Sequence, residues 1–297
     1  MANAEGASRK LRLRLPDIGQ LLDGRYQIEQ KVAGGTYGIV YHATDTTTGE
    51  RVAVKCLLPS AATSMAVVRR FEREILVIKD LTHPNLISIF GHGLSTDGCL
   101  YYVMEYLDGE DLGGRIRRGV LSPRGAGLVA VQVLLALEEA HNHDIVHRDL
   151  KPENIYLQEV EDGRIRVRVL DFGIAKVVGE RGESMERLTL NNEACGTPTY
   201  MAPEQISGEA VGPWTDLYAL ALITVEMMTG EVVVRGRSFI ETLRLQMSVE
   251  VAMPESIKGT AFAYVLSHAL EKKTKDRYQA ARHMREDLVS ALKDMSN

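Results

Sequence analysis

Several absences narrow what this chain can be. Its three cysteines, Cys56, Cys99 and Cys195, are widely spaced and form no CxxC pair, which argues against a disulfide scaffold and predicts free thiols in a reducing compartment. The longest apolar runs, residues 128–137 and 217–225, are shorter than the ~20 residues that a membrane-spanning helix needs, so they predict buried helices. A strong excess of positive charge is absent too: the chain has 35 Lys and Arg and 40 Asp and Glu, a balance that predicts no general affinity for nucleic acid.

The pattern at the N-terminal end favours a flexible tail or an edge strand over a targeting segment. Basic residues between positions 9 and 14 alternate with leucines, and no continuous apolar core follows them. We therefore expect residues 1–24 to form a tail, 25–293 to form one domain and 294–297 a short end. With 297 residues, the chain is long enough for a large core shared by two lobes.

The first half of the chain has the patterns of β-strands. Glycines at positions 34–38 precede the β-branched and aromatic run 39–41, which predicts a hairpin that turns at the glycines. In residues 51–57, alternation places Val52, Val54 and Cys56 on one face and Lys55 on the other. A further strand is expected at 100–104, before a break at 105–111.

One helix is expected within this first half. Between residues 64 and 81 the apolar positions recur at helical spacing, and they include Phe71, Ile75 and Ile78. Glu74 lies at the edge of this apolar stripe, so it is the carboxylate of the helix that we expect to be functional.

The second half reads as mainly helical. A helix is predicted at 128–142, and a strand at 164–169 with Ile165, Val167 and Val169 on its apolar face. Asp171 follows the end of that strand, and the chain is helical by pattern from Trp214 onward. The fold class is therefore α+β, with a β-rich half followed by an α-rich half.

The segments that carry chemistry are HRDLKPEN, residues 147–154, and DFG, residues 171–173. In such an arrangement Asp149 can orient an acceptor hydroxyl, Lys151 can reach a transferred phosphate, and Asn154 and Asp171 can offer oxygen ligands to Mg²⁺. Four polar positions at fixed spacing make a chance match improbable. We assign no zinc to His141 and His143, because one HxH pair without further ligands is a weak metal signal.

The glycine cluster is weaker evidence by itself, because glycines also form ordinary hairpin turns. Its context favours phosphate binding: Lys55 follows Gly38 by seventeen residues and can neutralise phosphates, and Glu74 can hold Lys55 by an ion pair. The alternative for Lys55 is a surface lysine at a strand end.

Together, VAVK at 52–55, HRDLKPEN, DFG and GTPTYMAPE at 196–204 resemble the eukaryotic-like protein kinases over residues 26–292. KPEN and GTPTY are typical of the serine/threonine branch, and the glycine-rich segment with GTPTYMAPEQ is most similar to the bacterial Hanks-type kinases. The resemblance implies a bilobal fold: a small β-rich N-lobe with one key helix at 25–104, a hinge at 105–111 and a larger α-helical C-lobe at 112–293.

The resemblance also implies roles for single residues. Met104 is the gatekeeper of the adenine pocket, residues 105–107 form the hinge, Val40 and Ala53 cover the adenine, and Tyr156 lies beneath it, where the family more often has an aliphatic side chain. The full nucleotide-binding set is Val32, Ala33, Gly34, Gly35, Gly38, Val40, Ala53, Lys55, Met104, Glu105, Tyr106, Leu107, Tyr156 and Asp171.

Other implied roles concern the acceptor and regulation. Thr197 bonds Asp149 and Lys151 in the substrate platform, and Glu204 pairs with Arg277 as a structural ion pair. Arg148 senses phosphorylation of the segment between Ile174 and Cys195, where Thr189 is the leading autophosphorylation site and Ser184 the second, and Phe172 decides how Asp171 points. Ala33 departs from the family, since it occupies the first glycine position of the GxGxxG pattern.

These features predict an ATP- and Mg²⁺-dependent kinase that phosphorylates serine or threonine of proteins, itself included. Expected partners are protein substrates and a transient dimer, with no nucleic acid and no membrane span, and the expected location is cytoplasmic. The alternatives are a pseudokinase scaffold, against which Lys55, Asp149 and Asp171 are all present, and a small-molecule phosphotransferase, against which GTPTYMAPE argues.

Overall fold

The structure is a computed structural model that describes residues 14–35, 38–59, 71–72, 75–76, 78–96, 98–160, 163–172, 198–248 and 250–295. These residues form two compact units. The N-terminal unit comprises the described residues up to Lys79 together with Ile89–Tyr106. The C-terminal unit comprises Asp80–Ser88 and the described residues from Leu107 onward.

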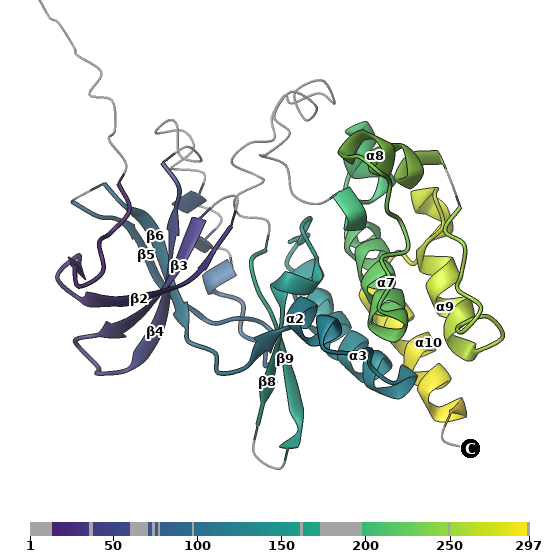
Figure 1. Ribbon diagram of the computed structural model, residues 1–297, viewed down its shortest axis with the longest axis horizontal. Coiled ribbons are helices and arrows are strands. Elements are labelled where there is room, and N and C mark those ends of the chain that lie inside the picture. Colours follow the sequence, from purple (N-terminus) through teal and green to yellow (C-terminus); the bar gives the residue numbers. More distant parts are fainter. Residues whose placement is uncertain are drawn as a thin grey trace, which may run out of the picture. The chain divides into compact units, whose positions relative to one another are not determined.

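The N-terminal unit is built on one antiparallel sheet of six strands (Figure 1). Its strand order is β1-β2-β3-β4-β6-β5. The strands are β1 (Leu21–Leu22), β2 (Tyr26–Gly34), β3 (Gly38–Asp45), β4 (Arg51–Leu57), β5 (Ile89–Leu94) and β6 (Leu100–Glu105). Strands β2 and β3 pair on either side of the glycine cluster, which confirms the predicted hairpin.

The core of this unit follows the predicted alternation of β4. Val52, Val54 and Cys56 are almost fully buried in one apolar cluster, which also contains Cys99. Cys56 and Cys99 are both free thiols, as expected, and the thiol pKa of Cys56 is raised by its hydrogen bond with Cys99 and by burial. Cys195 lies outside the described residues.

The helix predicted for residues 64–81 is seen at its described positions 71–72, 75–76 and 78–79. Phe71, Ile75 and Ile78 are buried there, as the spacing indicated. Phe71 packs against Tyr102 of β6, with ring centroids 6.1 Å apart, so this helix contributes to the core of the N-terminal unit.

The C-terminal unit is mainly helical, and α3 (Pro123–Asn142) packs against α7 (Pro213–Thr229) and α10 (Ala281–Asp294), as Figure 1 shows. Ser122 caps α3 by accepting the N–H of Gly125, and Pro123 begins the helix where its missing N–H costs nothing. Helix α7 ends at Gly230, whose positive φ of 74° suits the left-handed cap. The other helices are α2 (Leu112–Arg117), α6 (Pro203–Ser207), α8 (Phe239–Ser248) and α9 (Ala261–Ala269), with short 3₁₀ turns η1 (Pro152–Asn154), η3 (Pro198–Tyr200) and η4 (Thr274–Asp276).

A small antiparallel sheet completes this unit. It joins β7 (Glu110–Asp111), β8 (Ile155–Glu159) and β9 (Ile165–Val169). Of the three residues predicted on the apolar face of β9, Val167 and Val169 are buried, whereas Ile165 at the start of the strand is 45% exposed. The side chain of Gln132 in α3 donates to the carbonyl of Ile165 (3.2 Å), which ties this end of β9 to α3 through its backbone.

Within the described ranges, no helix is both long and apolar enough to cross a membrane.

Candidate functional site

His147 fastens the loop of residues 147–154 to the segment that follows β9. Its Nε2 donates to the carbonyl of Leu170 (2.8 Å), and its Nδ1 accepts the N–H of Asp149 (3.3 Å). The imidazole also packs on the ring of Phe172, with centroids 4.7 Å apart, and both side chains are buried. Because a carbonyl can only accept, Nε2 carries the proton, and one side chain holds the two chemistry-bearing segments together.

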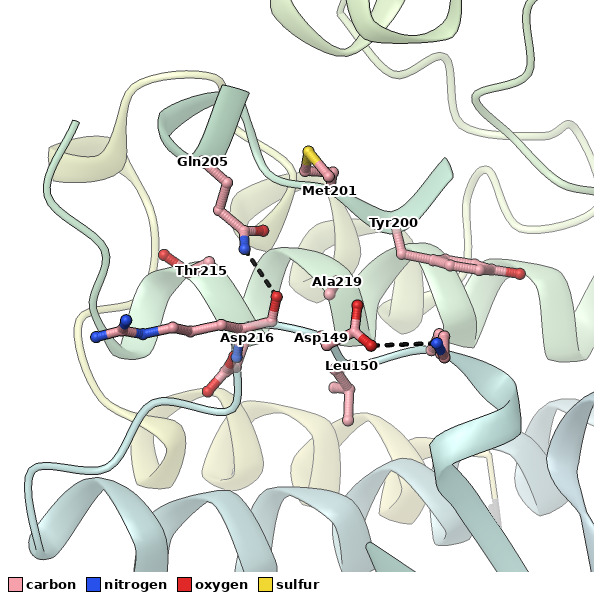
Figure 2. Close-up of a pocket in the computed structure, with 10 residues that line it drawn as sticks. Asp149, Leu150, Tyr200, Met201, Gln205, Thr215, Asp216 and Ala219 are labelled. Atoms are coloured by element: carbon pink, nitrogen blue, oxygen red, sulfur yellow. Dashed lines mark hydrogen bonds and ion pairs between the residues drawn. The ribbon is translucent and has the colours of Figure 1, made fainter. Parts of the chain in front are cut away.

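Asp149 and Lys151 form an ion pair on this loop, with 3.1 Å between Oδ2 and Nζ (Figure 2). Their side chains are 17% and 29% exposed, so both are partly shielded yet accessible from solvent. A carboxylate and an ammonium held this close can act together on an acceptor hydroxyl and a phosphate.

Asn154 links the end of the loop to Asp171. Its Nδ2 donates to the backbone carbonyl of Asp149 (2.8 Å), and its own backbone carbonyl accepts the N–H of Leu170 (2.8 Å). With Nδ2 committed to a carbonyl, the amide presents its oxygen on the other side. A neutral oxygen and the Asp171 carboxylate are ligands of the kind that Mg²⁺ prefers, so the residues fit that ion.

The backbone at the site is strained. Arg148 and Asp171 have φ of 63° and 54°, in the left-handed region that side chains other than glycine rarely adopt. Such conformations persist only where surrounding contacts impose them. For Arg148 the contact is visible: its N–H donates to Oδ1 of Asp216 (2.9 Å).

Asp216, at the start of α7, is the buried anchor of this loop. Besides the N–H of Arg148, its carboxylate accepts the N–H of His147 (2.8 Å) and Nε2 of His141 (2.8 Å). Burial acts to raise the pKa of Asp216, but the hydrogen bond and charge of His141 and the N–H of His147 lower it overall. His143, by contrast, bonds the carbonyl of Glu139, so the two histidines of the HxH pair have different partners.

Figure 2 shows that a pocket beside Asp149 is closed by residues from α6, α7 and the turn η3. Gln205 reaches across it: its Nε2 donates to the carbonyl of Arg148 (2.8 Å), while its Oε1 accepts the N–H of Ala202 (3.1 Å). Gln205 therefore connects the segment after η3 to the loop that carries Asp149. The pocket is lined by Arg148, Asp149, Leu150, Lys151, Tyr200, Met201, Gln205, Thr215, Asp216 and Ala219.

Tyr200 adds a polar contact at the edge of this pocket. Its hydroxyl donates to Oε2 of Glu226 at 2.5 Å. Burial and this hydrogen bond raise the pKa of Tyr200. Burial also raises the pKa of Glu226, and the negative charge of Glu153 acts in the same direction. The sequence patterns did not single out Tyr200 or Glu226.

The ion pair predicted between Glu204 and Arg277 is confirmed. Two hydrogen bonds join them, Nη1 to Oε1 at 2.9 Å and Nη2 to Oε2 at 3.0 Å, and both side chains are fully buried. Thr215 donates to the same Oε1 (2.7 Å). This bidentate pair ties α6, which follows the turn η3, to the segment after η4.

In the N-terminal unit, Lys55 lies in the middle of β4. It is opposite Val40 of β3 and Tyr102 of β6, and its Nζ lies 5.9 Å from the centroid of the Tyr102 ring. Ala53 is opposite Met104 in the same register, and both are buried. Two of the residues expected to contact adenine are therefore direct neighbours across two strands.

The glycines of the cluster differ in whether a side chain would fit at their positions. Val32, Ala33 and Gly34 belong to β2, and Ala33 pairs with Val40 without a left-handed φ, so the alanine is compatible with this backbone. A Cβ added to Gly38 would lie 2.6 Å from the backbone oxygen of Cys56. At Gly35 it would meet no described atom within 4 Å.

The expected hinge contains residues of both units. Tyr106 lies against His42, with ring centroids 4.7 Å apart, and under the guanidinium of Arg51. Glu105 ends β6. In the C-terminal unit, the hydroxyl of Tyr156 donates to the carbonyls of Leu107 (3.2 Å) and Gly109 (2.7 Å), a contact that an aliphatic residue at position 156 could not make.

Four expected site residues lie outside the described residues: Glu74, Ser184, Thr189 and Thr197. Three residues that hold the loop in place were missed from the sequence: His141 was weighed only as a metal ligand, and Asp216 and Gln205 had no assigned role. Their partners are 75, 69 and 57 positions away in the chain, a separation that local patterns do not reveal.

An antiparallel sheet unit and a helical unit, with a lysine on a central strand of the first and the Asp149, Lys151 and Asn154 loop in the second, define a phosphotransferase fold of the kinase class. The chain belongs to the protein kinase domain family, whose match covers residues 26–289. It is of the Hanks type and of the bacterial branch, as predicted. It is 32% identical to the serine/threonine-protein kinase pkn3 of Myxococcus xanthus, over 95% of this chain and 53% of that protein.

Two further comparisons agree. The chain is 32% identical to the serine/threonine-protein kinase PrkC of Bacillus subtilis, over 93% of this chain and 42% of that protein. The chain thus spans about half the length of these curated relatives. The crystal structure of a mutant of the PknI kinase domain of Mycobacterium tuberculosis matches with a TM-score of 0.73 at 24% identity, covering 94% of this chain and 99% of that one. This likeness confirms the bilobal kinase fold.

Proposed function

We propose that this chain transfers the γ-phosphoryl group of ATP to serine or threonine hydroxyls of proteins. The observation that supports this most is the ion pair of Asp149 and Lys151, partly exposed and fixed to the buried carboxylate of Asp216 through the backbone of the loop. Relatives named serine/threonine-protein kinases over most of this chain support the same assignment.

Asp149 and Lys151 have complementary roles in the proposed reaction. Asp149 accepts a hydrogen bond from the acceptor hydroxyl and aims its oxygen at the phosphorus. Such a positioned base contributes about 10²- to 10⁴-fold. Lys151 neutralises charge on the group that is transferred, and the 3.1 Å pair keeps both atoms at the place of transfer.

Asn154 and Asp171 are the residues that would hold Mg²⁺. Mg²⁺ in such sites takes one or two protein ligands together with phosphate oxygens of the nucleotide, and it neutralises the charge of those oxygens when bound. The packing of Phe172 on His147 is the contact that we propose sets the direction of Asp171.

For ATP, the proposal uses the backbone of Gly34, Gly35 and Gly38 near the phosphates and Lys55, held by Glu74, as their counter-charge. Met104, Ala53, Val40 and Tyr156 would contact the adenine, and residues 105–107 would offer backbone groups to its edge. Val32 and Ala33 continue the strand that enters the glycine cluster.

The acceptor side and its regulation are further parts of the proposal. Thr197 would bond Asp149 and Lys151, and Arg148 would receive a phosphate placed on Thr189 or Ser184. Autophosphorylation between two copies would require a transient dimer. The two buried free thiols, Cys56 and Cys99, support a cytoplasmic location.

Intact mass spectrometry of the protein incubated with ATP and Mg²⁺ tests this function. We expect mass to rise in steps of one phosphoryl group, and Asp149→Asn and Lys55→Met to abolish the gain. Asp144→Asn is the matched control, because Asp144 is exposed on the same connection, and asparagine tolerates its left-handed φ of 59°. Absence of any gain on the protein and on casein would reject kinase activity in favour of a scaffold.

A further inference from the structure

A chain of side-chain hydrogen bonds in the C-terminal unit ends on the backbone of the turn η3. Nζ of Lys272 donates to Oη of Tyr218 (2.8 Å), and that hydroxyl donates to Oε1 of Gln246 (2.6 Å). Nε2 of Gln246 donates in turn to the carbonyl of Thr199. Lys272 also donates to the backbone carbonyl of Gln246 (2.9 Å). Helices α7 and α8 and the segment after α9 thus converge on one peptide group.

The direction of each bond in this chain follows from elementary chemistry. An ammonium can only donate, so the hydroxyl of Tyr218 accepts from Lys272 and has its single proton left for Gln246. Oε1 of Gln246 must therefore face Tyr218, which turns Nε2 toward the carbonyl of Thr199. Lys272 and Tyr218 fix the orientation of the amide without contacting η3 themselves.

The orientation of the Gln246 amide matters because the amide is buried. Tyr218 and Gln246 are 0% exposed and Thr199 is 6% exposed, so the amide of Gln246 cannot exchange these two partners for bulk water. Two cations hold the ring of Tyr218 in place: Nζ of Lys272 is 5.2 Å and the guanidinium of Arg277 is 4.6 Å from its centroid. A rotated amide would set two oxygens against each other.

The turn that Gln246 holds is part of the site. Thr199 is followed directly by Tyr200, which lines the pocket beside Asp149 (Figure 2). Helix α8, which carries Gln246, also makes apolar contacts next to η3: its Leu243 packs with Met201 and Ile206 in a small buried cluster. A change at Gln246 therefore reaches the pocket through η3, although Gln246 is not among the residues that line it.

We propose that Gln246 is a positioning residue for the protein acceptor: its amide, oriented by Tyr218 and Lys272, sets the place of η3 beside Asp149. The proposal rests on the proposed kinase function and extends it to the residues that decide how well a polypeptide segment is seated. Gln246 bonds the residue before Tyr200, which lines the pocket beside Asp149, so the proposal predicts an effect on the acceptor and none on the nucleotide.

Steady-state kinetics with casein as acceptor, at varied casein and varied ATP, tests the proposal. Gln246→Glu keeps Oε1 for Tyr218 but places an oxygen against the carbonyl of Thr199. We expect the KM for casein to rise by about fivefold or more, because the buried carbonyl of Thr199 loses its donor. The KM for ATP should stay within twofold. Tyr218→Phe, which keeps the ring and removes the hydroxyl, should shift the same constant in the same direction by less.

The control is Gln279→Glu, which removes an equivalent Nε2 donor from the carbonyls of Thr274 and Arg277 at an exposed position. It should leave both KM values unchanged. An unchanged casein KM in Gln246→Glu and Tyr218→Phe overturns the proposal, and so does an equal rise in both KM values together with a lowered melting temperature, because that pattern marks a purely structural role.

A second readout separates this inference from the proposed function. Amide hydrogen exchange of the segment 198–202 needs no catalysis, and we expect it to be faster in Gln246→Glu and Tyr218→Phe than in the parent protein. Faster exchange in a protein that lacks kinase activity would reject the proposed function while retaining the link from Gln246 to η3. Unchanged exchange would reject the link itself.

Discussion

The two units are each stabilised by an arginine–carboxylate pair, and the pairs differ in their surroundings. In the N-terminal unit, Arg25 bonds Asp45 through Nε and Nη2, and the arginine side chain is 48% exposed. In the C-terminal unit, Arg277 bonds Glu204 with both nitrogens of its fork, and the two side chains are 0% and 1% exposed. An arginine–carboxylate pair therefore has a half-exposed arginine in one unit and is fully buried in the other.

This difference extends to how each unit holds its site residues. In the C-terminal unit, buried polar side chains bond the backbone of the site segments: Asp216 bonds the loop that carries Asp149, and Gln246 bonds η3. In the N-terminal unit, strand register places Lys55 between Val40 and Tyr102. A loop without a sheet to define its course needs buried polar partners, because its backbone groups must still be satisfied.

The largest expected effect on stability comes from replacing the arginine of each pair. Arg277→Met leaves the carboxylate of Glu204 buried without its counter-charge, so we expect it to lower the free energy of unfolding by ~3–5 kcal/mol. Arg25→Met should cost much less, because Asp45 also accepts the N–H of Thr47 and Arg25 is already half in water. Urea denaturation of both variants measures the difference. Similar losses would show that burial does not separate the two pairs.

A second and smaller effect is expected in the N-terminal unit, where packing rather than charge sets the geometry. In Gly38→Ala the new methyl would lie 2.6 Å from the backbone oxygen of Cys56, so β3 must move away from β4. We expect a loss of ~1–3 kcal/mol and weaker ATP binding. Gly35→Ala is the control for stability, because no described atom lies within 4 Å of its added methyl. Thermal unfolding and ATP titration measure the two effects of Gly38→Ala, and equal melting temperatures of the two variants would contradict the steric account.

The sequence predicted the elements that depend on local patterns. The strands at 51–57 and 100–104 and the hairpin around the glycines agree with the structure because alternation and turn residues are properties of neighbouring positions. HRDLKPEN could be interpreted from sequence for the same reason, since Asp149, Lys151 and Asn154 lie within one short loop. The exposure of Ile165 could not be predicted, because alternation assigns a residue to a face and does not tell how far that end of the strand is covered.

The rest of the site depends on partners distant in sequence. Asp216 reads as the first turn of an apolar helix, and only the fold brings it under residues 147–148, 68–69 positions earlier. Gln205 ends the motif GTPTYMAPEQ, but the motif does not tell which backbone group its side chain bonds, and Gln246 is a glutamine in a helix without a motif to distinguish it. A buried polar side chain is recognised by the backbone group that it satisfies, and that group is known only once the chain is folded.

The smallest expected effect concerns pH and sharpens the comparison of the two pairs. The hydrogen bond from Arg25 lowers the pKa of Asp45 to about 2, although burial opposes the change. Since this folded-state pKa is below the usual value of 3.8, the pair stabilises the protein fully above about pH 4, and the contribution is lost as pH falls toward 2. Asp45→Asn should therefore lose stability at pH 6 and show a shallower decline between pH 4 and pH 3 than the parent protein, as measured by urea midpoints. Asp17→Asn, at an exposed ion pair with Arg14, is the control and should follow the parent curve. Parallel acid profiles for the parent and Asp45→Asn would mean that the pair of Arg25 and Asp45 contributes nothing that depends on its charge.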